Sequence, residues 1–182
     1  MNARQIVLAS RPKGMPTAET FRTEEITLPS LQNDEVLLRG LYYSVDPYMR
    51  GRMSDAKSYA EPYEVNKPIY GGVVAIVEES NSSAFIKGDA VLGFLPWSTQ
   101  MVAQAKDLKK VDTSLAPGSY YLGILGMPGL TAFFGLMDIG KPKAGETVVV
   151  SGAAGAVGIL VGQIAKIKGC PLDGISGGPD KV

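Results

Sequence analysis

The sequence of 182 residues predicts a mixed β and α/β protein, with an all-β unit over residues 1–120 and a β-α-β unit over residues 121–182. Three observations support this prediction. The first part of the chain contains short apolar runs separated by polar turn clusters, which is typical of a small barrel or sandwich. Residues 147–151 (TVVVS) form a continuous β-branched run, as in a parallel strand buried on both faces. A glycine-rich turn and a helical pattern follow this run directly, so the two patterns meet near residues 113–128.

In the first unit, strands are predicted from apolar runs bounded by turn-forming residues, namely residues 5–8, 35–43 and 72–77. Residues 48–67 lack the alternation of a strand, so we predict a loop over the barrel there. The 22 glycines and 12 prolines of the chain supply many turns and leave little room for a helical bundle.

In the second unit, residues 131–136 and 155–168 predict helices, and Gly169 ends the second of them. Residues 172–176 predict a second strand, although proline, aspartate and glycine in this region are unfavourable in a buried strand. The apolar face of the second helix needs cover. We expect this face to pack on the barrel or on another copy of the chain, or to be disordered; its residues are Val157, Leu160, Val161 and Ile164.

The composition excludes several kinds of chemistry. The chain has no histidine, which excludes a Ser-His-Asp triad, a Cys-His pair and a His-ligated metal. Its one cysteine, Cys170, excludes an internal disulfide and a Cys-rich zinc site. Eighteen basic residues balance eighteen acidic ones, so no net charge attracts nucleic acid or an anionic membrane. Because no signal-peptide pattern and no membrane-spanning apolar run is present, we expect a cytoplasmic protein without a metal site.

The glycine-rich turn at residues 151–158 (SGAAGAVG) is the motif most informative about function. It reads A-x-G-x-x-G against the dinucleotide pattern G-x-G-x-x-G, with Ala153 in place of the first glycine. Gly155 allows the backbone to approach a pyrophosphate, and Gly158 allows the helix to lie close to the strand. The helix N-terminus then presents unpaired N–H groups to the phosphates. The alternative is a helix start that needs small residues only for packing.

The end of the second predicted strand bears on the choice of nucleotide. NAD needs an acidic side chain there, about 20 residues beyond the motif, to bind the ribose 2′-OH. Residues 176–181 (SGGPDK) instead offer small residues and Lys181, which is a cation for the 2′-phosphate of NADP. We therefore favour NADP(H). NAD remains an alternative because Asp180 is acidic, and the alternative for Lys181 is a solvent-exposed side chain that binds no phosphate.

Two further motifs, residues 44–53 (SVDPYMRGRM) and 126–132 (GMPGLTA), precede the glycine turn. With these three motifs the chain resembles the zinc-independent medium-chain dehydrogenase/reductases over nearly its whole length. Within that family it is similar to the group of prostaglandin reductases, leukotriene B4 12-hydroxydehydrogenases and plant double-bond reductases, with its bacterial NADP-dependent oxidoreductases. The resemblance implies a GroES-like β-barrel domain followed by the first β-α-β portion of a Rossmann domain.

The resemblance also implies a reaction and a set of site residues. The family reduces the carbon–carbon double bond of α,β-unsaturated ketones and aldehydes with NADPH. In this chain Tyr48 would face the substrate and Lys181 would meet the 2′-phosphate. Three residues would lie along the nicotinamide, namely Met127, Pro128 and Thr131. The pyrophosphate would lie at Ala156 and Val157, within a set of cofactor-binding candidates formed by Gly152, Ala153, Gly155, Ala156, Val157 and Gly158.

Hydride transfer to the β-carbon of an enone leaves an enolate, whose oxygen needs a hydrogen-bond donor. Tyr48 and Arg50 are the candidate catalytic donors. Each has a structural alternative, because Tyr48 would also suit an aromatic position at a barrel rim and Arg50 would suit a salt bridge. Four aromatic residues are candidates for an apolar substrate wall, unless they are simply packed: Tyr59, Tyr63, Phe94 and Trp97.

The predicted activity is NADPH-dependent reduction of a small enone, alkenal or quinone by a homo-oligomeric enzyme without nucleic-acid or membrane partners. A complete dinucleotide-binding sheet has six strands, so we expect this chain to be an N-terminal portion of such an enzyme. Two alternatives remain. One is a GroES-like binding or assembly module, and the other is a truncated product without catalytic activity.

Overall fold

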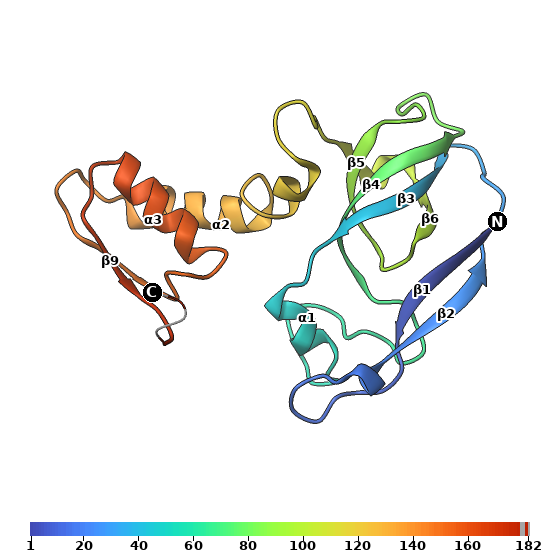
Figure 1. The fold of residues 1–182 in the computed structure, drawn as a ribbon, viewed down its shortest axis with the longest axis horizontal. Helices are drawn as coiled ribbons and strands as arrows, with labels where there is room; N and C mark the ends of the chain where they lie inside the picture. The colour runs from blue at the N-terminus through green and yellow to red at the C-terminus, as the bar shows by residue number, and fades with distance from the viewer. Residues whose placement is uncertain (179–180, 182) are drawn as a thin grey trace. The chain divides into compact units, whose positions relative to one another are not determined.

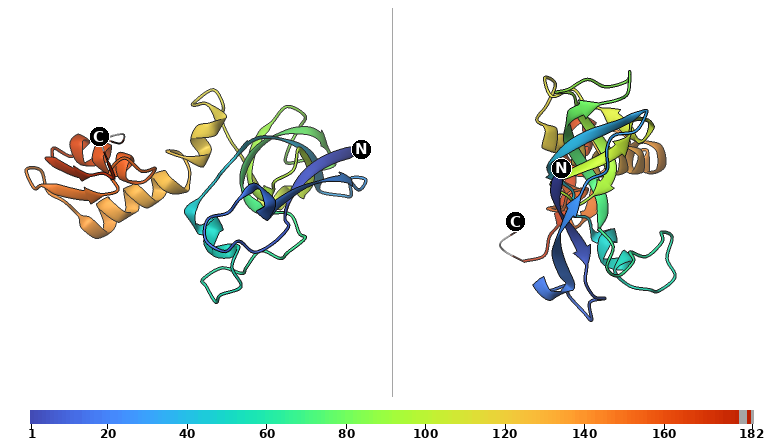
Figure 2. Two further views of the ribbon diagram at one scale, coloured as in Figure 1. Left: turned by 60° about the horizontal axis from the view of Figure 1, so that its bottom comes forward. Right: turned by 90° about the vertical axis from the view of Figure 1, so that its right-hand side faces the viewer.

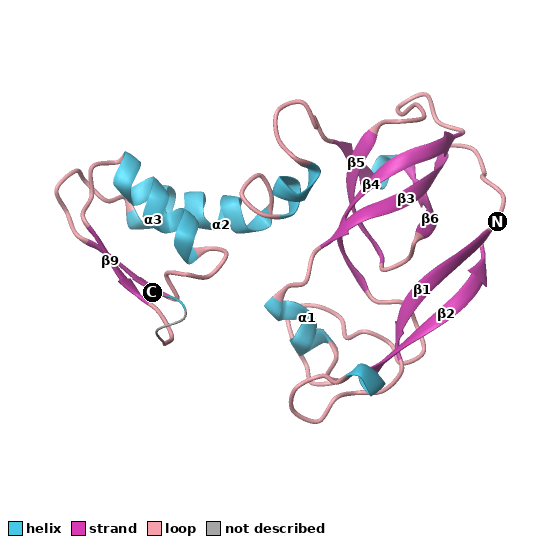
Figure 3. Cartoon of the chain, in the orientation of Figure 1, coloured by secondary structure: helices cyan, strands magenta, loops and turns pink. Residues whose placement is uncertain are grey.

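The computed structural model describes residues 1–178 and 181 and divides into two compact units, Met1–Gly118 (unit 1) and Ser119–Val182 (unit 2) (Figure 1). Unit 1 is built mainly from strands, whereas unit 2 contains the longer helices (Figure 3). In the part of the chain that is described, no helix has both the length and the apolar character needed to cross a bilayer.

Unit 1 combines a strand pair with a five-stranded antiparallel sheet. The pair is β1 (Asn2–Leu8) with β2 (Phe21–Thr27), in a register that sets Leu8 opposite Phe21. Isolated bridges from Gln5 to Ser98 and from Val7 to Pro68 hold β1 beside the sheet, and Figure 2 shows the strands curling round a common interior. The sheet has the order β6-β3-β4-β5-β7, with β3 at Glu35–Tyr43, β4 at Tyr70–Ser80, β5 at Ala90–Pro96, β6 at Gln100–Gln104 and β7 at Leu108–Lys110.

The core of unit 1 follows from the alternation of apolar residues along these strands. One cluster fills the interior of the sheet and includes Val36, Leu38, Val73, Ala75, Val77, Val91 and Met101. A second cluster surrounds the helix α1 (Pro47–Arg52) and consists of Leu8, Met49, Met53, Tyr63 and Ile69. Two short 3₁₀ turns, η1 (Ala18–Thr20) and η2 (Ala105–Asp107), complete the unit.

The helix α1 corrects the loop predicted over residues 48–67. Pro47 stands in its first turn, where the missing proline N–H costs no hydrogen bond. Met49 and Met53 lie one turn apart and are both buried, so tertiary packing holds the helix in place. Six residues are too few for a helical period to emerge from the sequence, which is why the pattern did not predict it.

The boundary between the units lies at the start of η3 (Gly118–Leu122). In unit 2, α2 (Met127–Phe134) follows and continues as the π-helical turn η4 (Gly135–Gly140). Then follow β8 (Val148–Ser151), α3 (Gly158–Ile167) and β9 (Leu172–Ile175). The strands β8 and β9 are parallel, with Val148 opposite Leu172, as the β-α-β prediction requires. The prediction that this run is buried on both faces was wrong, because only Val150 of β8 is buried and Val149 is 64% exposed. The helix was predicted to begin at residue 155, but the structure keeps residues 152–157 in turns, so α3 begins at Gly158.

Much of the apolar face of α3 is covered within unit 2, so the disorder predicted as one of its three outcomes was wrong, while Val157 of that face stays 37% exposed. The helix packs against α2, β8 and β9, as Figure 1 shows for α2 and α3. Its buried residues Leu160 and Ala165 face inward, and Ala165 forms a small core with Leu136 and Cys170. The strand β9 forms despite its aspartate and glycine because all four of its residues are exposed, which leaves the Asp173 carboxylate in water.

Candidate functional site

The glycine turn between β8 and α3 is compact and closes on its own backbone. Gly152 adopts a left-handed conformation with φ of 64°, which favours glycine. A Cβ on Gly158 would overlap the carbonyl oxygen of Gly152 and lie 2.8 Å from the Cα of Ala153. A Cβ on Gly155 would lie 3.1 Å from that same oxygen. Gly158 is therefore required by the turn itself, and the packing explanation holds at this position.

Some backbone N–H groups of the turn donate hydrogen bonds within the protein, and others have no acceptor within the described part of the chain; we call the latter open amides. The Ala153 N–H donates to the Ile175 carbonyl at 3.0 Å, and the Gly155 N–H donates to the Gly152 carbonyl at 2.9 Å. Among the described residues, no acceptor is found for four N–H groups, those of Ala154, Ala156, Val157 and Gly158.

These open amides make the turn suitable for binding an anion. The turn is mostly exposed, its side chains are small, and the first turn of α3 carries no acidic residue. Unpaired N–H groups at the start of a ten-residue helix attract anions through hydrogen bonding and through the helix dipole. The residues present therefore fit a phosphate or pyrophosphate.

The three nicotinamide candidates lie on the first turns of α2. Met127 and Thr131 are exposed and one turn apart, so they share a face of the helix, and Pro128 is half-buried. Gly126 and Gly129 explain how this helix starts, because a Cβ on either would overlap the carbonyl oxygens of Tyr121 and Ile124 respectively. The helix α2 packs against α3, which carries the glycine turn at its N-terminus.

Lys181 is exposed and its backbone N–H donates to the Gly178 carbonyl at 3.2 Å. Within residues 1–178, no hydrogen bond or salt bridge engages its side chain. Asp180, the acidic alternative, lies outside the described residues. The position of Lys181 after β9 is consistent with a cation at the end of the second strand.

Tyr48 lies on α1 in unit 1. It is half-buried and packs against the cluster that contains Met49 and Tyr63. Burial raises the pKa of the Tyr48 phenol, and the negative charge of Asp46 adds to the effect, while the positive charge of Arg52 opposes it. A phenol with a raised pKa stays protonated at neutral pH and can donate a hydrogen bond. The position also agrees with the alternative that Tyr48 is a packed aromatic residue, because its ring contacts the core.

Arg50 has its guanidinium bound to backbone carbonyls. Its Nε donates to the Gly14 carbonyl at 2.9 Å, and its Nη2 donates to Gly14 at 2.6 Å and to Pro12 at 3.4 Å. The side chain pairs with no carboxylate in the described part of the chain, so the alternative of a salt bridge was wrong. The planar fork of arginine suits two neighbouring carbonyls, a partner set that the sequence pattern does not reveal.

The four aromatic candidates have different environments. Tyr63 is 4% exposed and its hydroxyl donates to the Tyr70 carbonyl at 2.6 Å, so it belongs to the core. Tyr59 is exposed, and Phe94 is 54% exposed and stacks on Tyr70 with ring centroids 6.1 Å apart. Trp97 is half-buried with its indole Nε1 buried and without a hydrogen-bond partner among the described atoms. The guanidinium carbon of Arg52 lies near two of these rings, 4.2 Å from the Tyr63 centroid and 5.6 Å from that of Phe94.

A groove in unit 1 was not predicted from the sequence. It has a volume of about 430 Å³ and lies between β1, the end of β3 and the segment that joins β5 to β6. Its lining includes Arg4, Ile6, Tyr43, Val45, Trp97 and Ser98. Only Trp97 was among the sequence candidates, because the other residues come together from strands far apart in the chain.

Comparison with known proteins gives the family. The family described as the N-terminal domain of oxidoreductase matches residues 4–111, which is more than half of the chain. The chain belongs to this oxidoreductase family. The match confirms the resemblance to the medium-chain dehydrogenase/reductases and the predicted fold class, a GroES-like barrel followed by part of a Rossmann domain.

Individual relatives agree with this assignment. A Bacillus subtilis protein, YfmJ, named as an NADP-dependent oxidoreductase, is 58% identical over 178 residues, which are 98% of this chain and 52% of that protein. The NADPH-dependent curcumin reductase of Escherichia coli is 49% identical over the same shares. The crystal structure of CurA from Vibrio vulnificus in complex with NADPH superposes with a TM-score of 0.89 at 48% identity, over 97% of this chain and 52% of CurA. The chain spans about half the length of the curated relatives that it matches.

Proposed function

We propose that this chain serves in NADPH-dependent reduction of the carbon–carbon double bond of α,β-unsaturated ketones, aldehydes or quinones. Residues 1–120 would form the GroES-like substrate domain, and residues 121–182 would form an incomplete NADP-binding Rossmann segment. The main support is the set of open amides at the N-terminus of α3, in a turn whose shape suits a pyrophosphate. The names of the relatives, which include reductases of curcumin, prostaglandin and 2-alkenals, support the same class of reaction.

The residues of unit 2 would hold the cofactor. The amides of Ala156, Val157 and Gly158 would bind the pyrophosphate, with Gly152, Ala153 and Gly155 shaping the turn around it. Met127, Pro128 and Thr131 would lie along the nicotinamide, and Lys181 would pair with the 2′-phosphate. When bound, NADPH would supply the hydride.

The side chains of unit 1 would act on the substrate. Hydride addition to the β-carbon leaves negative charge on the carbonyl oxygen, and the Tyr48 O–H would donate a hydrogen bond to it. A tyrosine hydroxyl carries its proton at neutral pH and is therefore able to donate this bond. Arg50 was the second candidate donor, but its guanidinium is already bound to the carbonyls of Pro12 and Gly14.

The cofactor site is tested with a carboxylate placed among the open amides. Ala156→Glu puts negative charge where the pyrophosphate would lie, and it also suits a helix N-terminus, so folding should be preserved. We expect NADPH affinity to fall by on the order of 100-fold, from repulsion and the loss of access to the amides. NADPH is titrated into purified protein that contains this chain, with bound-NADPH fluorescence as the readout.

Ile167→Glu is the matched control, because it adds the same charge to the exposed far end of the same helix. Equal losses for both variants, or no loss for Ala156→Glu, would contradict the proposed site. Crotonaldehyde-dependent oxidation of NADPH then tests the reaction. Saturable binding of NADPH without turnover of any enone or quinone would instead favour the binding module.

A further inference from the structure

The helix α1, which carries Tyr48, is too short to hold its own position. It has six residues, fewer than two turns, and isolated helices of that length are not stable in water. Met49 and Met53 anchor one face of it in the core. The orientation of the rest of the helix must therefore come from contacts to the loops on either side.

The first of these loops is tied to α1 by a reciprocal pair of arginines. Arg50 of the helix donates to the carbonyls of Pro12 and Gly14, with Nη2 at 2.6 Å from the Gly14 oxygen. Arg11 of the loop donates in return from Nη1 to the Met53 carbonyl at 3.0 Å, at the end of the helix. Charged donors to carbonyls form stronger bonds than neutral ones, and the bonds from Arg50 and from Arg11 run in opposite directions.

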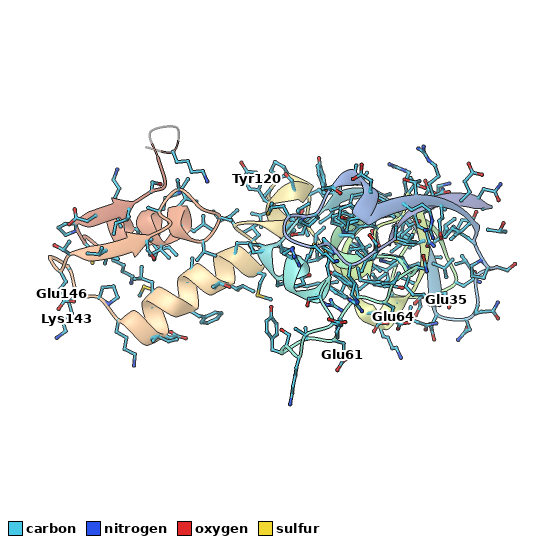
Figure 4. The ribbon with its side chains drawn as sticks, turned by 90° about the horizontal axis from the view of Figure 1, so that it is seen from below. Glu35, Glu61, Glu64, Tyr120, Lys143 and Glu146 are labelled. Carbon is cyan, nitrogen blue, oxygen red and sulfur yellow. The ribbon has the colours of Figure 1, made fainter. Side chains whose placement is uncertain are left out.

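The second loop is tied by Arg52. Its Nε donates to the Glu61 carbonyl at 2.8 Å, and its own carbonyl accepts from the Tyr63 N–H at 2.7 Å. Its guanidinium carbon lies 4.2 Å from the centroid of the Tyr63 ring, close enough for a cation–π contact. Figure 4 labels Glu61 in this loop, which follows α1 directly.

We propose that Arg50 and Arg52, together with Arg11, are positioning residues that hold the Tyr48 hydroxyl in place for the reaction. We call their bonds to the backbone carbonyls the arginine clasp. The inference rests on the proposed function, because the arginine clasp affects the reaction only through the position of Tyr48. It also assigns Arg50 to the orientation of the helix rather than to direct contact with the enolate.

The kinetic test is a double-mutant cycle between Arg50 and Tyr48. Turnover of crotonaldehyde with NADPH is measured for purified protein that contains this chain. Tyr48→Phe should lower kcat by about 100-fold, the effect of losing one oxyanion donor. Arg50→Gln should lower kcat by about tenfold with little change in KM, because a displaced donor stabilises the transition state less well. In the Tyr48→Phe background, Arg50→Gln should have almost no further effect on kcat.

Two further variants separate positioning from general stability. Arg50→Lys keeps the charge but lacks the planar fork, so it should recover only part of the lost kcat. Arg39→Gln is the matched control, because Arg39 is an exposed arginine on β3 that pairs with Glu78 of β4. Equal loss of kcat from Arg50→Gln with and without Tyr48 would overturn the inference, as would full activity of Arg50→Gln.

Amide hydrogen exchange tests the clasp without any enzymatic activity. The Met53 N–H donates to the Met49 carbonyl at 3.1 Å in the last turn of α1. Arg50→Gln should make this amide exchange about tenfold faster, while Arg39→Gln should leave it unchanged. Unchanged exchange in Arg50→Gln overturns the clasp. Faster exchange in a protein that reduces no enone supports the clasp but overturns the proposed reaction and the catalytic effect assigned to it.

Discussion

Unit 1 and unit 2 bury their apolar residues to very different extents. The sheet of unit 1 encloses a cluster in which Val36, Leu38, Val73 and Val91 are completely inaccessible to water. In unit 2 the strand β9 is exposed along its whole length, and the core is a small cluster around Ala165. A sheet of two strands with helices on one side encloses little interior, so the stability of unit 2 depends more on close backbone contacts.

The candidate sites differ in the same way. In unit 2 the cofactor candidates are backbone amides in a turn with small side chains, so the site depends on the path of the main chain. In unit 1 the substrate candidate is a side chain, Tyr48, on a helix held by arginines. Substitutions should therefore act on unit 2 through sterics in the backbone and on unit 1 through lost packing and lost hydrogen bonds.

The largest expected effect is the loss of a core side chain in unit 1. Leu38 is fully buried, and Leu38→Ala should lower the free energy of unfolding of unit 1 by about 3 kcal/mol through lost burial and a cavity. Leu160→Ala in unit 2 should cost less, because Leu160 is 9% exposed at the edge of a smaller core. The free energy of unfolding of each unit is measured for both variants by urea unfolding, with amide hydrogen exchange in that unit as the readout. Equal costs would contradict the difference between the two units.

A smaller effect is expected from one methyl group in the glycine turn. Gly158→Ala places a Cβ against the Gly152 carbonyl, which should cost about 2 kcal/mol in unit 2 and widen the turn. Gly135→Ala is the control, because its Cβ would meet nothing within 4 Å. Gly158→Ala should lower the unfolding temperature and weaken NADPH binding, whereas Gly135→Ala, at an exposed helical position, should do neither. A fully stable Gly158→Ala variant would show that the turn is looser than the structure indicates.

The smallest effect at neutral pH is expected from Tyr63→Phe. It removes the bond from the buried hydroxyl to the Tyr70 carbonyl, worth about 1 kcal/mol in unit 1. Burial raises the pKa of Tyr63 from 10.0 to about 12, so its contribution is fully present below pH 10 and is lost as the pH rises to about 12. Unfolding measured at several alkaline pH values should therefore show a steeper loss for the original chain than for Tyr63→Phe. Identical pH profiles would contradict the assignment of this loss to Tyr63.

Local patterns in the sequence were sufficient for the fold class and for the elements of unit 2 nearest the glycine turn. The β-branched run became β8, and the strand predicted at residues 172–176 became β9, because both depend on residue types within a short window. Gly169 ends α3 in a left-handed conformation as predicted, with φ of 75°. The three motifs were also sufficient to place the chain in its family.

The tertiary structure alone decided which groups meet. The sequence did not indicate that α1 forms, that α2 covers the apolar face of α3, or that Arg50 binds carbonyls 36 positions away. Residue types do not indicate a short helix or a carbonyl acceptor, because every residue has a carbonyl and any loop can present one. The sequence by itself thus determined the class of the molecule and the place of its glycine turn between β8 and α3. Folding determined which backbone carbonyls the arginines of α1 bind.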